Sequence, residues 1–209
     1  MIPNNRAFNG RETFEENGKV FYRSYKVEEQ GKFRLKIRVV SINSPYRQAI
    51  AFSLSSSPKF KGSILINGQK FQAEKKKLNY VMPVALPDNN EIIMDFDIAE
   101  GYVRLANASD FLDDYPEMIE KISAQTGRTR DQFRGCSYTS GFSAGHLYGN
   151  AFWMEQLSDN RYRFYCNDHK MDDDFDDLVF DLENEIKTNA KYKLKVLFVA
   201  ELAGKWDSM

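Results

Sequence analysis

The feature that most constrains the fold is the strict alternation of apolar and charged side chains in residues 33–39. Four apolar residues are separated by three basic ones: Phe33, Arg34, Leu35, Lys36, Ile37, Arg38 and Val39. Successive side chains of a β-strand point to opposite faces of the sheet, whereas a helix would spread these apolar residues around its circumference. The segment therefore predicts a strand with one buried and one solvent-facing side.

Similar segments, rich in aromatic residues (16 Phe and 11 Tyr), recur along the chain. The further expected strands are 19–27, 49–55, 62–66, 69–73, 78–84, 91–98, 101–106, 150–157, 161–166, 177–182 and 191–200. Asn67-Gly68 predicts a tight hairpin turn, and 158–160 predicts a second hairpin. Because no strand–helix–strand alternation is visible, we expect a mostly all-β fold, an antiparallel jelly-roll-type β-sandwich.

One segment departs from this pattern. Apolar residues recur at helical spacing between 109 and 125, Pro116 suits a helix start, and Gly127 suits a helix end. We expect one inserted helix around 110–126, followed by a long loop rich in Gly, Arg and aromatic residues. The helix and the loop form an insertion at about 108–149 in a single domain that spans residues 1–209.

The charge balance excludes some partners. With 29 Lys and Arg against 30 Asp and Glu, net charge does not favour nucleic acid or an anionic membrane. No apolar run reaches the roughly 20 residues that cross a bilayer, and the first residues do not resemble a signal peptide. We therefore expect a cytoplasmic protein whose two cysteines, Cys136 and Cys166, are reduced packing thiols.

Residues 168–181 contain seven aspartates and one lysine. Calcium takes about six to eight oxygen ligands, and closely spaced carboxylates on a turn supply them. The candidate ligands are Asp172, Asp174, Asp176 and Asp177. An alternative stays open, in which the turn is exposed and its carboxylates pair with Lys or Arg from neighbouring strands.

The loop after the helix is a second candidate site. Its glycines allow close backbone approach, its aromatic rings suit sugars, and its arginines suit anions. The candidate ligand-binding residues are Arg128, Arg134, Tyr138, Tyr148 and Trp153. Alternatively, the rings pack in the core and the arginines cover the helix and the acidic turn.

Two short stretches, Gly31–Val40 and Gly101–Asn107, resemble strands of carbohydrate-binding modules and other galactose-binding-like sandwiches. Separately, Asp172–Phe180 is similar to the acidic strand of bacterial calcium-associated β-sandwich domains, in which an Asp-rich turn runs into an apolar strand. These resemblances imply a sugar-binding or adhesive role with structurally bound calcium.

The leading expectation is a non-catalytic recognition module that binds carbohydrate and carries a calcium-stabilised acidic turn. The alternatives are a structural or interaction subunit with a protein partner, or a glycan-active hydrolase. Gly141-Phe-Ser-Ala-Gly145 has the letters of a hydrolase nucleophile motif. It lacks the expected strand before it and helix after it, so we expect no serine hydrolase.

Overall fold

The computed structural model describes residues 13–54, 61–71, 79–110, 120, 123–124, 127, 129, 139–140, 151–168 and 174–186. Within these ranges the chain forms fourteen strands. Their bounds are β1 Thr13–Glu16, β2 Lys19–Tyr22, β3 Tyr25–Val27, β4 Gly31–Ile42, β5 Arg47–Leu54, β6 Lys61–Ile66, β7 Gln69–Phe71, β8 Asn79–Val84, β9 Glu91–Glu100, β10 Val103–Asp110, β11 Thr139–Ser140, β12 Ala151–Ser158, β13 Arg161–Asn167 and β14 Leu178–Ile186.

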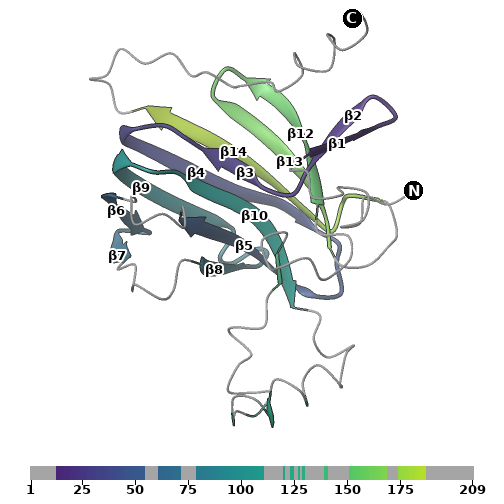
Figure 1. Cartoon of the computed structure of the whole chain (residues 1–209). Coiled ribbons are helices and arrows are strands. Elements are labelled where there is room, and N and C mark those ends of the chain that lie inside the picture. Colours follow the sequence, from purple (N-terminus) through teal and green to yellow (C-terminus); the bar gives the residue numbers. More distant parts are fainter. Residues whose placement is uncertain are drawn as a thin grey trace, which may run out of the picture.

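The strands form two sheets (Figure 1). The larger sheet has the order β1-β2-β12-β13-β14-β4-β9-β6-β7, and the smaller has the order β11-β10-β5-β8, with β3 also paired to β10. The strand pairs are antiparallel, as expected from the sequence. The prediction of a mostly all-β, antiparallel chain is therefore confirmed.

One hydrophobic core lies between the two sheets. It combines the inner residues of β4, β9, β13 and β14 with those of β5, β8 and β10. On β4, the alternation seen in the sequence becomes an alternation of burial, since Phe33, Leu35, Ile37 and Val39 are buried. Phe164 stacks on Phe180 with ring centroids 4.6 Å apart. The two layers and their shared core are consistent with the expected β-sandwich.

Two Asn-Gly pairs form tight hairpin turns. Asn67 and Gly68 have φ values of 47° and 79° between β6 and β7, as predicted. Asn17 and Gly18 do the same between β1 and β2, with φ values of 52° and 73°. Both turns need two successive residues with positive φ, a conformation that Gly adopts freely and Asn tolerates.

Some of the expected strands have different bounds in the structure. The segment 19–27 is not one strand, because it divides into β2 in the larger sheet and β3 beside the smaller sheet. Strand β10 extends to Asp110, into the predicted insertion, because its last residues pair with β5 and β11.

The predicted helix lies mostly outside the described residues. Glu120, Ser123 and Ala124 have helical backbone, and the Gly127 N–H donates to the Ser123 carbonyl at 2.8 Å. The helix therefore stays a prediction. In the described part of the chain, no helix is long and apolar enough to cross a membrane.

Candidate functional site

The described part of the acidic turn is braced by hydrogen bonds to the chain that follows β4. The side-chain amide of Asn43 donates to Asp176 Oδ2 at 3.0 Å, and the Asn43 N–H donates to the Asp177 carbonyl at 3.1 Å. Within the turn, the Asp176 N–H donates to Asp174 Oδ1 at 3.4 Å. Two of the predicted calcium ligands, Asp174 and Asp176, thus accept hydrogen bonds that fix the turn's shape.

The residue between these two aspartates has an unusual backbone. Phe175 has a φ of 55°, which is sterically costly for a bulky side chain. Its ring is buried against Phe21, with centroids 4.9 Å apart. The packing of this ring holds the chain in the bend that turns Asp177 away from solvent.

Asp177 and Asp168 are buried, whereas Asp174 of the same acidic segment is exposed and Asp176 is half-buried. Asp177 is 3% exposed and Asp168 is 0% exposed. The Asp168 N–H donates to Asp177 Oδ2 at 2.7 Å, and the Ser44 hydroxyl donates to Asp168 Oδ2 at 2.5 Å. The Tyr46 N–H in turn donates to Ser44 Oγ at 3.0 Å. The two buried carboxylates therefore lie where the segments that follow β4 and β13 meet the segment that precedes β14.

Three polar residues of the smaller sheet are also buried. Gln48 of β5 and Asn107 and Ser109 of β10 are each at most 1% exposed. The Asn107 amide donates from Nδ2 to the Asn167 carbonyl at 2.7 Å, next to Asp168 in the chain. We call Ser44, Gln48, Asn107, Ser109, Asp168 and Asp177 the inter-sheet polar cluster.

The opposite, solvent-facing side of the larger sheet carries columns of charge. Basic and acidic strands alternate across this side of the sheet. The basic residues are Arg161 and Arg163 on β13 and Arg34, Lys36 and Arg38 on β4. The acidic residues are Asp181, Glu183 and Glu185 on β14 and Glu91, Asp95 and Asp97 on β9. We call this surface the outer charged face. Neighbouring columns form ion pairs, such as Arg34 with Asp95 at 2.9 Å and Lys36 with Glu91 at 3.0 Å.

Asp181 is the most enclosed carboxylate of this face. It accepts hydrogen bonds from Arg161 Nη2 at 2.5 Å, Arg163 Nε at 2.7 Å and Arg163 Nη2 at 3.1 Å. Burial by itself raises the pKa of Asp181, but the hydrogen bonds and charges of Arg163 and Arg161 outweigh burial and lower this pKa below its ordinary value. The group is therefore held ionised.

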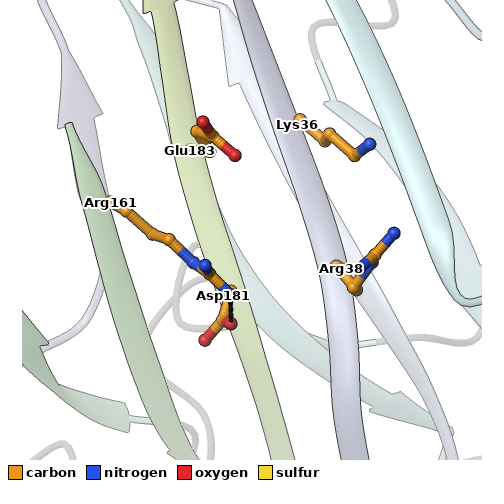
Figure 2. A pocket seen from close by; sticks show the side chains of 5 residues that line it. All are labelled: Lys36, Arg38, Arg161, Asp181 and Glu183. Carbon is orange, nitrogen blue, oxygen red and sulfur yellow. Dashed lines mark hydrogen bonds and ion pairs between the residues drawn. The ribbon is translucent and has the colours of Figure 1, made fainter. Parts of the chain in front are cut away.

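Beside Asp181 there is a small depression of about 90 Å³, lined by Lys36, Arg38, Arg161, Asp181 and Glu183. Figure 2 shows Asp181 and Glu183 on one strand, Lys36 and Arg38 on the next, and Arg161 reaching across from the other side. The hydrogen-bonded sheet fixes the backbones that carry these groups. The depression thus offers both cationic donors and anionic acceptors at its rim.

Trp153 is the predicted ligand-binding residue that the structure describes. Its ring stacks on Tyr165, with centroids 4.1 Å apart and planes 5° apart, and Lys19 Nζ lies 4.0 Å from the ring centroid. The Tyr165 ring fills one face of the indole, so Lys19 must occupy the other. A sugar could stack on Trp153 only if Lys19 moved away.

Other predicted site residues fall outside the described part of the chain. These are Arg128, Arg134, Tyr138 and Tyr148 of the loop and Asp172 of the acidic turn. Among the described residues, no three or more His, Cys, Asp or Glu side chains are arranged to hold a metal ion together. A calcium ion at this turn therefore needs Asp172 or neutral oxygen ligands in addition to the described carboxylates.

Sequence reasoning did not single out Asn107 or the Arg161–Asp181–Arg163 group as candidates. One signal was available for the last, since Arg161 and Arg163 alternate with aromatic residues, as do the basic residues of 33–39. Nothing local indicated that Asn107 of β10 would hydrogen-bond to Asn167 of β13, next to Asp168, because these strands belong to different sheets. Cys166 is a free, buried thiol, and burial and then the charge of Asp177 raise its pKa well above the ordinary value.

Comparison with known proteins adds no relative. No family model, no curated protein sequence and no solved structure matches the chain.

Proposed function

We propose that this protein is a non-catalytic recognition module of jelly-roll type that binds a glycan on its outer charged face, with calcium stabilising the acidic end of the sandwich. The jelly-roll part is supported by the path of the chain. It passes from one sheet to the other between β4 and β5, β5 and β6, β7 and β8, β8 and β9, and β9 and β10. From β4 to β10, sequential strands other than β6 and β7 therefore lie in different layers, as this winding requires.

The observation that carries the glycan proposal is the depression beside Asp181. A sugar hydroxyl both donates and accepts hydrogen bonds, so neighbouring hydroxyls suit a rim that holds carboxylates and guanidinium groups together. Glu183 and Arg161 lie opposite each other on paired strands and supply one acceptor and one donor. Because the sheet already holds these strands in place, little ordering entropy remains to be lost on binding.

The calcium part of the proposal rests on the oxygen-rich acidic end. Carboxylates of Asp174, Asp176 and Asp177, with Asp172, are the hard oxygen ligands that calcium takes. Asn43 and Ser44 brace this end through hydrogen bonds to Asp176 and Asp168. A bound ion would stabilise the fold without taking part in a reaction.

The glycan proposal is tested by probing the protein on an array of neutral and uronic-acid-containing oligosaccharides and then titrating a hit. Glu183→Gln should weaken binding about tenfold, since a hydrogen bond to a charged group contributes roughly 1.5–3 kcal/mol and 1.4 kcal/mol is tenfold in affinity. Glu185→Gln is the matched control on the same strand outside the depression, and it should change affinity less than about twofold.

Two outcomes would contradict this proposal. One is an array without a bound oligosaccharide. The other is equal weakening by the two substitutions, which would mean that the depression does not contact the sugar.

A further inference from the structure

The inter-sheet polar cluster lies where a sandwich of this kind would ordinarily have apolar core. On β10, Val103 and Leu105 point into the hydrophobic core. Alternate residues of a strand share a face, so Asn107 and Ser109 point into the same space between the sheets. Gln48 pairs with Ser109 on the neighbouring strand and shares that inner face with Ile50. The core thus becomes polar over the last residues of β10.

Three oxygen atoms of this cluster have no hydrogen-bond partner among the described residues: Gln48 Oε1, Asn107 Oδ1 and Ser109 Oγ. Each belongs to a residue that is at most 1% exposed. Leaving a buried polar atom unsatisfied costs about 1–3 kcal/mol, so native proteins supply a partner in nearly every case. Three such atoms in one place indicate that something else occupies the space between them.

A hydrogen bond ties Asn107 to the chain that carries Asp168. Its Nδ2 atom is tied to the Asn167 carbonyl at 2.7 Å, directly before Asp168. The planar amide therefore fixes where Oδ1 can lie, next to the chain that carries Asp168. Asp168 and Asp177 are in turn linked by the hydrogen bond from the Asp168 N–H to Asp177 Oδ2.

We infer that the inter-sheet polar cluster is a binding site for a calcium ion, with Asp168, Asp177 and Asn107 as ligands. The side-chain oxygens of Gln48 and Ser109 are further ligands. Carboxylate, amide and hydroxyl oxygens are what a hard cation takes, and flexible coordination by six to eight of them suits calcium better than magnesium. This inference rests on the calcium part of the proposed function. It keeps the calcium ion and Asp177 but moves the ion to the inner side of the turn, so that Asp168 and the polar side chains between the sheets replace Asp172, Asp174 and Asp176 as ligands.

The test measures the melting temperature of the full chain with calcium and with a chelator. At a calcium concentration roughly 100-fold above Kd, the wild-type Tm should rise by about 5–10 °C. Asn107→Leu keeps the side-chain volume and removes the oxygen, so it should abolish the rise. Asp174→Asn should retain it. Asn184→Leu is the matched control, since Asn184 is also a buried amide with an unpartnered Oδ1 among the described residues, but on β14.

A second variant keeps the test decisive if Asn107→Leu does not fold. Asn107→Asp adds a third carboxylate, which repels the other two without an ion and strengthens binding with one. Its Tm should fall in chelator and recover in calcium, so that the calcium-dependent rise exceeds that of the wild type. Equal destabilisation with and without calcium would mean that the space holds only water, and it would overturn the inference.

Two other results would also overturn it. If Asp174→Asn abolishes the calcium-dependent rise while Asn107→Leu retains it, the ion binds on the outer side of the turn. If calcium leaves the wild-type Tm unchanged, there is no calcium site. Neither result bears on the glycan titration of Glu183→Gln, so failure of the ion site and failure of the glycan surface are distinguished.

Discussion

The substitution Asp181→Asn tests whether the Arg161–Asp181–Arg163 group stabilises the fold. The Asp181 side chain is only 5% exposed and accepts three charge-assisted hydrogen bonds from the two arginines. Asparagine keeps the shape and one acceptor oxygen but removes the charge. It also places an amide NH₂ against a guanidinium, which has no acceptor to offer.

The size of the effect follows from the exposure of the partners. A hydrogen bond to a charged group contributes roughly 1.5–3 kcal/mol. The arginine side chains are 44% and 31% exposed, so water replaces part of what they lose, and the sum must be discounted. We expect a loss of about 2–3 kcal/mol in the free energy of unfolding. For a chain of this size, that corresponds to a Tm lower by about 5–10 °C.

Urea denaturation followed by circular dichroism measures this loss from the shift in the midpoint. Asp97→Asn is the control on the same outer charged face. The Asp97 carboxylate is 54% exposed, and its contact with Lys32 spans 3.9 Å. Its removal should cost less than about 0.5 kcal/mol. If Asp181→Asn costs no more than Asp97→Asn, burial does not strengthen this ion pair and the reasoning is wrong.

Two further predictions concern pH and packing. Because the folded-state pKa of Asp181 is lowered, its stabilising contribution is complete above the ordinary carboxyl pKa of about 4 and is lost as pH falls through the folded value. The stability difference between wild type and Asp181→Asn should therefore shrink below about pH 4, and urea midpoints at neutral and acid pH check this; an unchanged difference would refute it. Gly62→Ala should cost about 1–3 kcal/mol, because a Cβ there would lie 2.6 Å from the Asp97 carbonyl oxygen. Thermal unfolding of Gly62→Ala checks this, with Ser63→Ala as the control, whose stability should lie within about 0.5 kcal/mol of wild type. A Gly62→Ala variant as stable as the wild type would contradict the prediction.

The sequence was most informative where one strand face is buried. In the predicted strand 177–182, Leu178, Phe180 and Leu182 occupy alternate positions, and all three lie in the hydrophobic core. The Asn67-Gly68 turn was also predictable, because a two-residue hairpin needs successive positive φ values. Both conclusions depend on interactions between residues close together in the chain.

Other features depended on contacts between distant residues. Segment 19–27 has the composition of one strand, yet β2 pairs with β12 and β3 pairs with β10. Trp153 was expected to offer a flat face to a ligand, but Lys19 and Tyr165 cover its ring. No local pattern indicates which strands will pair or which side chains will meet, so these contacts could not be predicted from the sequence.

The amino-acid sequence by itself determined that this chain forms mostly β-strands, because side-chain alternation fixes which face of each strand is apolar. It also located the acidic segment. The tertiary structure decided that β14 lies beside β4, more than a hundred residues earlier in the chain, and so brings Asp181 between basic columns. It also decided that Asp168 and Asp177 are buried, and that Asn107 hydrogen-bonds to the residue before Asp168. The reason is physical: alternation sets the direction of a side chain, whereas only the pairing and stacking of sheets set what that side chain meets.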